Sequence, residues 1–287
     1  MNALEIRGLS KKLGGKSKTA GAFYLENIDL TLPSGCIMGL VGENGAGKST
    51  TIKLILDMLR RDSGSVLIFG RDITNNGSEL KEDIGVVLDE VGIPDCLTSG
   101  QVGKIMRNTY KNWSDEAYAG YLKKLSIPPD KQFREYSRGM KMKLGIAIAM
   151  SHDPKLLILD EATSGLDPVV RDEVVQMLAD FTRDENHSVL VSSHIVSDLE
   201  KVCDYIAFLH NGKLLLCEEK DRLLDEYGMI RCSDEQLREL DPAAVKYIKQ
   251  TFYGNEAIIL RNGIPSNMIV SPISIEELFV YMVKEER

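Results

Sequence analysis

The chain has 287 residues, of which 43% are hydrophobic and 27% are charged, and it carries a formal net charge of −8. This length fits one large α/β domain with a small appendage, and the acidic balance argues against a protein that coats DNA or RNA. No apolar run approaches the roughly 18–20 residues that a membrane-spanning helix needs, and the first residues lack the apolar stretch of a secretory signal. The five cysteines are scattered and form no CxxC pair, so we expect a reducing cytoplasm and neither a disulfide framework nor a zinc site.

The first third of the chain alternates between strand-like and turn-like segments. A Gly-, Lys- and Ser-rich segment at 14–21 is expected to form a loop, and apolar residues at helical spacing predict a helix at 50–59. Some of the apolar runs are continuous, which is typical of strands buried on both faces of a sheet. Strands are predicted at 4–7, 23–32, 36–41, 66–69 and 84–88.

From about residue 95 to residue 150, helical patterns replace the strands. Strands return at 155–159 and 188–191, on either side of a helix at 168–183. A hairpin then follows, with Asn211-Gly212 at its turn. Strands that alternate with helices predict a mainly parallel sheet with helices on both faces. The strands at 4–7 and 23–32 are expected to add an antiparallel part, and the helices at 95–150 to form an inserted subdomain.

After about residue 225 the pattern changes to a small α/β tail that ends in an amphipathic helix at 275–284. We therefore expect one domain at 1–225 and a small C-terminal extension at 226–287.

A glycine-rich segment between the strand at 36–41 and the next helix fits the P-loop pattern G-x-x-x-x-G-K-[ST]. Its glycines let backbone N–H groups approach phosphate oxygens, and the helix that follows begins with a partial positive charge. Lys48 is expected to reach the β- and γ-phosphates, and Ser49 to bind Mg²⁺. A chance glycine-rich turn is the alternative, and the position between a buried strand and a helix argues against it. The expected nucleotide-binding residues are Gly42, Glu43, Asn44, Gly45, Ala46, Gly47, Lys48, Ser49 and Thr50.

An apolar strand at 156–159 ends in two acidic residues, Asp160 and Glu161. The carboxyl edge of an open parallel sheet is where ligands bind in such folds. We expect Asp160 to hold Mg²⁺, directly or through water, and Glu161 to polarise a water aimed at the γ-phosphate. An apolar run followed by an acid is often only a strand that meets solvent, but the P-loop motif upstream favours the functional interpretation.

Between these two motifs stands the sequence Tyr-Ser-Arg-Gly-Met at 136–140. It resembles the signature motif of the nucleotide-binding domains of ABC transporters, whose common form is LSGGQ, and the resemblance covers about residues 3–217. In that family the signature serine and glycine, here Ser137 and Gly139, bind the γ-phosphate that the opposite protomer holds. The resemblance therefore implies a head-to-tail dimer with two ATP molecules between the subunits. Taken alone, Ser137 could simply cap a helix.

Two further segments resemble the same family. Residues 162–168 match the D-loop, in which Ser164 and Asp167 would couple the two sites, although Asp167 followed by proline is also a common helix start. His194 follows the strand at 188–191 and matches the switch histidine, which contacts the γ-phosphate and orients the attacking water. The resemblance thus implies catalytic roles for Lys48, Glu161 and His194.

The chain departs from the family pattern at two places. Asp89 stands where the family usually has a glutamine that contacts Mg²⁺ and water, so we expect Asp89 to bind the metal and hydrolysis to be altered or slower. The aromatic residue that usually stacks on adenine would lie near Leu13, which is aliphatic; Phe23 or Tyr24 could replace it, and core packing is the alternative for either.

The resemblance implies an ATPase that acts with Mg²⁺ at the cytoplasmic face of the membrane and drives membrane-spanning subunits that are separate chains. The signature variant, residues 108–125 and the C-terminal residues 271–286 resemble export-type subunits of Gram-positive drug and peptide-antibiotic transporters, so we expect export of a substrate that the sequence does not identify. The dimer would contain two copies of the chain, or the chain and a relative, and no nucleic-acid partner is expected. The alternatives are a non-transport or regulatory ABC ATPase and a nucleotide-gated binding module with weak hydrolysis.

Overall fold

The computed structural model describes residues 1–287 with the exception of 15–22, 253, 266–267 and 286–287. The chain divides into two compact units, Met1–Cys217 and Glu218–Arg287. The boundary expected from the sequence, at 225/226, falls within the helix α8 (Lys220–Glu226) of the second unit. The loop expected at 14–21 lies outside the described residues apart from Gly14.

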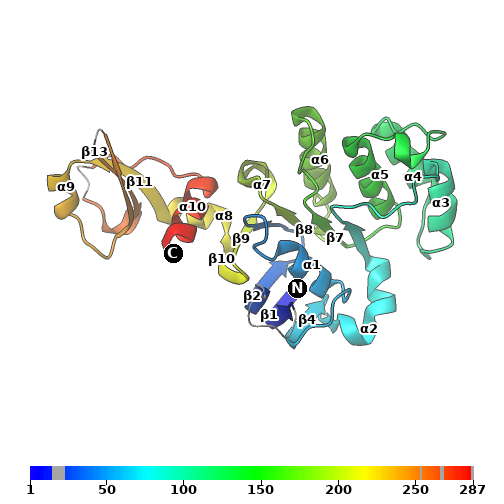
Figure 1. Cartoon of the computed structure of the whole chain (residues 1–287), viewed down its shortest axis with the longest axis horizontal. Coiled ribbons are helices and arrows are strands. Elements are labelled where there is room, and N and C mark those ends of the chain that lie inside the picture. Colours follow the sequence, from blue (N-terminus) through cyan, green and yellow to red (C-terminus); the bar gives the residue numbers. More distant parts are fainter. Residues whose placement is uncertain (15–22, 253, 266–267, 286–287) are drawn as a thin grey trace. The chain divides into compact units, whose positions relative to one another are not determined.

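Two sheets form the centre of the first unit (Figure 1). An antiparallel sheet has the strand order β2-β1-β4-β5, and a six-stranded sheet has the order β10-β9-β3-β8-β7-β6. The pairs β9-β3, β3-β8, β8-β7 and β7-β6 are parallel, so the mainly parallel sheet and the antiparallel N-terminal part are both confirmed. The strands are β1 (Asn2–Leu13), β2 (Phe23–Pro33), β3 (Ile37–Val41), β4 (Ser63–Ile68), β5 (Arg71–Asp72), β6 (Ile84–Val87), β7 (Leu156–Asp160), β8 (Ser188–Ser193), β9 (Tyr205–His210) and β10 (Lys213–Glu219).

The register of the parallel strands brings their carboxyl ends to one edge of the sheet. Val41 of β3 is opposite Ser193 of β8, and Ser192 is opposite Asp160 of β7. Because these strands end together, the segments that follow them lie at the same edge. The two acidic residues at the end of β7 and the loop after β3 are therefore neighbours in space although more than one hundred residues of chain separate them.

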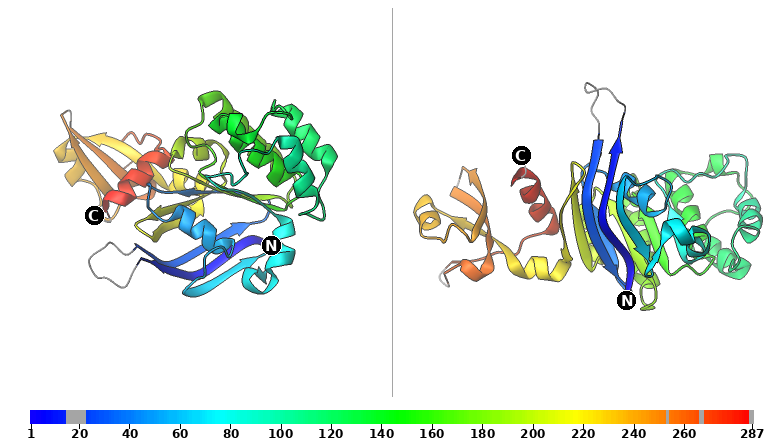
Figure 2. Two further views of the ribbon diagram at one scale, coloured as in Figure 1. Left: turned by 45° about the vertical axis from the view of Figure 1, so that its right-hand side comes forward. Right: turned by 90° about the horizontal axis from the view of Figure 1, so that it is seen from below.

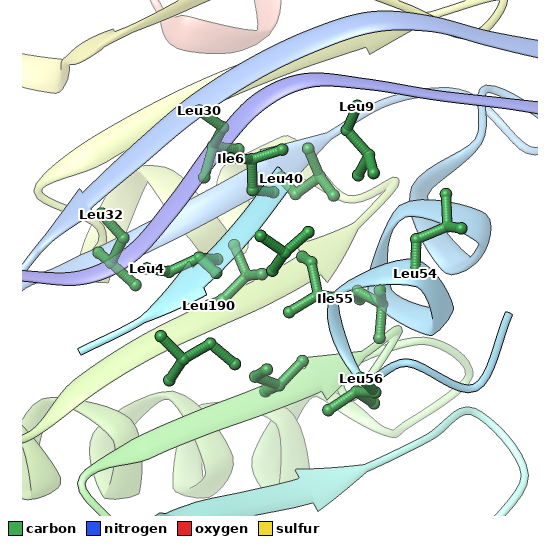
Figure 3. Close-up of a cluster of buried hydrophobic side chains, with 14 of the residues drawn as sticks. Leu4, Ile6, Leu9, Leu30, Leu32, Leu40, Leu54, Ile55, Leu56 and Leu190 are labelled. Carbon is green, nitrogen blue, oxygen red and sulfur yellow. The ribbon is translucent and has the colours of Figure 1, made fainter. Parts of the chain in front are cut away.

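A large hydrophobic cluster fills the space between the two sheets (Figure 3). Leu4 and Ile6 of β1 contribute to it from one side, and Leu40 and Leu190 from the other. The helix α1 (Lys48–Ile55) lies between the sheets (Figure 2) and adds Ile55. Because its aliphatic side chains are buried, α1 is held in this position, and its N-terminus stays beside the loop after β3.

Helices cover the opposite face of the six-stranded sheet. They include α6 (Pro168–Phe181) and α7 (Val196–Val202). Three further helices pack on one another: α3 (Ser99–Arg107), α4 (Asp115–Lys124) and α5 (Arg138–Met150). These last three form the inserted helical part between β6 and β7 that the sequence predicts. Two glycines let α5 approach β6: a Cβ on Gly85 would lie 2.6 Å from the carbonyl oxygen of Ala149, and one on Gly145 would lie 3.2 Å from Val87.

Some boundaries differ from the sequence prediction. The helix predicted at 50–59 begins at Lys48 and ends at Ile55, and Asp57 adopts a positive φ of 54°, which a continuing helix cannot accommodate. The helix α2 (Ile73–Leu80) was not predicted; its Asn-Asn-Gly sequence is typical of a turn, and Asn76 has non-helical backbone angles within it.

The second unit has its own small core. Its antiparallel sheet has the order β11-β13-β12, with β11 (Tyr227–Cys232), β12 (Val245–Thr251) and β13 (Gly254–Leu260). The helices α8, α9 (Asp234–Arg238) and α10 (Ile275–Glu285) complete it, so the α/β character and the final helix agree with the prediction. The core residues are Ile230, Cys232, Leu240, Ala257 and Ile259.

Candidate active site

The loop after β3 is built to leave backbone donors free. Gly45 and Gly47 adopt positive φ angles of 85° and 115°, which a glycine accepts without strain. A Cβ on Gly42 would lie 2.5 Å from the carbonyl oxygen of Leu209. No side chain caps the N-terminus of α1, whose N-cap residue is Gly47. The first N–H groups of α1 can therefore bind an anion that reaches this loop.

Lys48 is buried at the start of α1, where it is 5% exposed. Its ammonium donates to the carbonyl oxygens of Gly42 at 2.7 Å and Glu43 at 3.2 Å, so the lysine holds its own loop in a tight curve. The same nitrogen lies 2.9 Å from Oε1 of Glu161. The structure thus brings together the two residues that the sequence places at the phosphate loop and at the acidic pair.

Glu161 is the centre of the site. It follows β7 with a positive φ of 53°, a conformation that few non-glycine residues adopt. Its backbone N–H donates to the carbonyl oxygen and the hydroxyl of Ser192, at 3.1 and 3.0 Å. This strained backbone directs the Glu161 side chain to Lys48 and to His194, whose Nδ1 lies 2.7 Å from Oε2.

Charge decides the protonation state of Glu161. Burial by itself disfavours the ionised form, but the hydrogen bond and charge of Lys48, and then those of His194, outweigh burial and lower the pKa of Glu161 below its ordinary value. An ionised carboxylate only accepts hydrogen bonds, so Nδ1 of His194 carries the proton in this contact. Glu161 is therefore a carboxylate that a lysine and a histidine share.

Asp160 is buried, 3% exposed, and its Oδ1 accepts a hydrogen bond of 2.6 Å from the Ser192 hydroxyl. Ser192 thus orients Asp160 through its hydroxyl and Glu161 through its hydroxyl and carbonyl oxygens, and no sequence motif marks it. A residue opposite Asp160 in the register of a neighbouring strand was the only signal that could have found it.

A cavity of about 440 Å³ opens beside Lys48 and Glu161. Phe23 lines it together with Leu13, whereas Tyr24 is half exposed and lies under the ammonium of Lys12, so Phe23 is the one of these two aromatic residues that faces the cavity. The other lining residues are Asn44, Gly45, Gly47, Lys48, Ser49, Thr50, Asp89 and Glu161.

The signature residues lie elsewhere. Ser137 caps α5, its hydroxyl accepting from the N–H of Met140 at 3.3 Å, and it is exposed. Neither Ser137 nor Gly139 is among the residues that line the cavity beside Lys48. Within one protomer the structure therefore does not bring the signature to the phosphate loop.

Asp89 lines the cavity and also forms an ion pair of 2.9 Å with the guanidinium of Arg138, the residue after Ser137. Arg138 stands where the common signature form LSGGQ has its first glycine. This contact joins the segment that follows β6 to the first turn of α5.

The donors needed for Mg²⁺ are oxygen atoms, and Ser49, Asp160 and Asp89 offer a hydroxyl and two carboxylates. Among the described residues, no group of three or more His, Cys, Asp or Glu side chains could hold a metal ion by itself. These groups fit Mg²⁺ that arrives with a nucleotide, because that ion takes one or two carboxylates together with phosphate oxygens and water. Ser49 and Asp89 line the cavity, whereas Asp160 is not among its lining residues.

Comparison with known proteins gives the family. Residues 25–164 match the model of the family described as ABC transporter. The chain is 31% identical over 290 residues to the ABC transporter ATP-binding protein YtrB of Bacillus subtilis (strain 168), and the match covers 96% of this chain and 97% of YtrB. The chain belongs to the ABC transporter ATP-binding protein family. It is therefore an ATPase of the ABC type, and the resemblance found in its motifs is confirmed.

Two further comparisons agree with this family. The lantibiotic transport ATP-binding protein SrtF of Streptococcus pyogenes is 34% identical over 220 residues, which cover 76% of this chain and 91% of SrtF. A dimeric structure of the ATP-binding cassette MJ0796 bound to ADP and Pi has a TM-score of 0.67 at 20% identity and covers 76% of this chain and 98% of that one, which shows a common fold. No helix of the described residues is long and apolar enough to cross a membrane.

Proposed function

We propose that this ABC ATPase binds ATP with Mg²⁺ in the cavity beside Lys48 and hydrolyses it at the interface of a head-to-tail dimer. The observation that carries the proposal is the shared carboxylate: Glu161 lies 2.9 Å from the phosphate-loop lysine and 2.7 Å from His194. A lysine, a carboxylate and a histidine arranged in this way can bind phosphate, activate water and orient it.

The contacts of Glu161 with Lys48 and His194 indicate how ATP would prepare the site. Phosphate oxygens compete with Glu161 for the ammonium of Lys48, and the triphosphate offers more negative charge than one carboxylate. When Lys48 turns to the phosphates, Oε1 of Glu161 is released and can accept a hydrogen bond from a water molecule. Oε2 stays with Nδ1 of His194, which keeps the carboxylate in place.

Ser49 and Asp160 would hold Mg²⁺, with Asp89 as a third oxygen donor, and the ion would neutralise charge on the β- and γ-phosphates. Ser192 would keep the Asp160 carboxylate in one orientation, since its hydroxyl donates to Oδ1 at 2.6 Å. Phe23 would stack on the base from its position on the cavity wall.

The place of the signature supports the proposed dimer. Ser137 and Gly139 are outside the cavity of their own protomer, so their N–H and hydroxyl groups would serve the ATP of a second protomer. Because contacts to the γ-phosphate would then hold the dimer together, hydrolysis would loosen it and provide the mechanical step.

We further propose that the chain powers export of an unidentified substrate through membrane-spanning subunits that are separate chains, at the cytoplasmic face of the membrane. The lantibiotic transport function in the name of SrtF supports this class of transporter. Inside-out vesicles that contain the membrane subunits would test it, because ATP should drive an exported substrate into such vesicles and an imported one out of them.

Steady-state phosphate release tests the enzymatic proposal. The purified chain with ATP and Mg²⁺ should show turnover that rises more steeply than linearly with protein concentration, since two protomers form each site. Glu161→Gln should abolish turnover, and the matched control Glu239→Gln, at an exposed position in the second unit, should retain it. Equal turnover in the two variants would overturn the role of Glu161.

A further inference from the structure

Asp89 stands at the junction of two cavities. It lines the cavity beside Lys48 and also a second cavity of about 410 Å³, which is formed mainly by residues of the helical part such as Phe133 and Tyr136. A carboxylate at this junction can therefore face the nucleotide side or the α5 side. Which side it takes depends on the charges on each.

On the α5 side the charge is Arg138. Its guanidinium lies 2.9 Å from Oδ1 of Asp89, and the two side chains are 54% and 52% exposed. Arg138 also touches the loop before α6, because a Cβ on Gly165 would lie 2.9 Å from the Arg138 guanidinium. One side chain thus contacts the segment after β6 and the loop after the acidic pair, and it stands at the first turn of the signature helix.

The backbone that carries this pair is closely packed. Gly85 and Gly145 let α5 pack directly against β6, because neither has a side chain that would keep the two elements apart. Val91, two residues after Asp89, also lies against Gly145, since a Cβ added there would be 3.2 Å from it. The positions of Asp89 and Arg138 are therefore set by packing behind them, and the ion pair determines only where their side chains point.

We propose that Arg138 is a positioning residue that acts through Asp89: it holds the Asp89 carboxylate on the α5 side and competes for it with the Mg²⁺ that accompanies ATP. This inference rests on the proposed binding of Mg²⁺ with ATP in the cavity. Water weakens a half-exposed ion pair, so a divalent ion on a triphosphate can draw the carboxylate away. Binding of Mg²⁺ and ATP then breaks a link between β6 and the signature helix.

Substitutions at Arg138 and at Asp89 should shift the Mg²⁺ requirement of nucleotide binding in opposite directions. Removal of the Arg138 charge should free Asp89 and lower the Mg²⁺ concentration needed for nucleotide binding, whereas removal of the Asp89 charge should raise it. If Arg138 acts only through Asp89, its removal should have no effect once Asp89 is neutral. A merely structural role of Arg138 would affect folding or would act equally in both backgrounds.

The experiment uses the full chain and a fluorescent, non-hydrolysable ATP analogue, titrated with Mg²⁺. We expect Arg138→Gln to lower the half-saturating Mg²⁺ concentration by about two- to fivefold, the range that an exposed ion pair supports. Asp89→Asn should raise it, and Arg138→Gln combined with Asp89→Asn should match Asp89→Asn alone. Arg134→Gln is the matched control, because it removes the same charge at an exposed position on the preceding turn.

The possible results distinguish the role of Arg138 from the binding of Mg²⁺ in the cavity. An unchanged Mg²⁺ dependence in Arg138→Gln, or an equal shift with and without Asp89, would overturn the competition and leave the proposed function standing. Nucleotide binding that does not depend on Mg²⁺ in the wild-type chain would overturn metal binding in the cavity and, with it, this inference. Urea unfolding of each variant shows that the comparison is made between folded proteins.

Discussion

At the scale of single residues, the site depends on a charge pair taken out of water. Lys48 and Glu161 are 5% and 9% exposed and lie 2.9 Å apart. Each of these charges loses hydration when it is buried, and the ion pair offsets that loss. Removal of one partner would leave the other as an unpaired buried charge. A nucleotide phosphate replaces one partner without leaving Lys48 unpaired, and this exchange is the residue-scale basis of the proposed mechanism.

Lys48→Ala should lower ATP affinity on the order of 10- to 100-fold, because a hydrogen bond to a charged group contributes about 1.5–3 kcal/mol. Equilibrium titration with a fluorescent ATP analogue measures this change. Lys53→Ala is the control, since Lys53 is exposed on the same helix. Equal affinities of the two variants would show that the phosphates bind away from Lys48.

His152 provides a test of protonation away from the site. It is fully buried, its ring stacks on Tyr110 with centroids 3.9 Å apart, and Nε2 lies 3.2 Å from the carbonyl oxygen of Ile84. Burial lowers the pKa of His152, although the carbonyl groups of Ile84 and Ile148 oppose this effect. The folded chain therefore binds a proton at this ring more weakly than the unfolded chain does.

This difference predicts how stability changes with pH. Above the ordinary histidine pKa of 6.5 the ring is neutral in both states. As the pH falls below that value, the unfolded chain takes up a proton that the folded chain resists, so the free energy of unfolding decreases. Urea unfolding at neutral and mildly acidic pH should show a larger decrease for the wild type than for His152→Phe, which keeps a ring against Tyr110.

His187→Phe is the control for the histidine substitution, because His187 is only half-buried and stacks on Phe181. It should retain the pH dependence of the wild type. The same dependence in His152→Phe would contradict the assignment to His152.

At the scale of elements, the start of α6 holds the end of the loop that follows Asp160 and Glu161. Asp167 accepts hydrogen bonds from the N–H groups of Val169 and Val170, both at 3.1 Å, and Pro168 takes the first helical position. Further into the helix, Arg171 donates to the carbonyl oxygen of Leu166 at 3.2 Å. The loop between Glu161 and α6 is thus held at its end by the helix that follows it.

Asp167→Ala should lower the free energy of unfolding by about 1 kcal/mol, the usual cost of removing an N-cap side chain. The measurement is urea unfolding without nucleotide, so that any role of Asp167 in coupling the two sites does not contribute. Asp172→Ala, an exposed position within α6, should change stability much less. A loss as large in Asp172→Ala would contradict the capping role.

Elements with a strong pattern were predictable from the sequence, and those without one were not. The buried strands β3, β7 and β8 have continuous apolar runs, and each lies in the parallel sheet as predicted. The strand β12 lies at the edge of its sheet with exposed or half-buried side chains, so its sequence has no marked apolar pattern.

At the scale of the whole molecule, the sequence identifies the residues of the site better than their contacts. The motifs predict Lys48, Glu161 and His194 as members of one site, and the structure brings them together. The contact of Ser192 with Asp160 and that of Arg138 with Asp89 join segments 32 and 49 residues apart. No local pattern marks such pairs, because strand register and the packing of α5 on β6 create them.

The two units have separate cores, and the proposed catalytic residues belong to Met1–Cys217. Within that unit, Ser137 and Gly139 lie outside the cavity that holds Lys48 and Glu161. In the proposed mechanism, a second protomer therefore completes each site, and ATP holds the two protomers together.

Light scattering of the Glu161→Gln variant tests this requirement most directly. With saturating ATP and Mg²⁺ the variant should bind without hydrolysis and form a dimer, twice the 31.9 kDa mass of the chain. The same variant with Ser137→Glu added should stay a monomer, because a carboxylate at the signature would repel the partner's γ-phosphate. A monomeric Glu161→Gln chain with ATP bound would contradict the shared site.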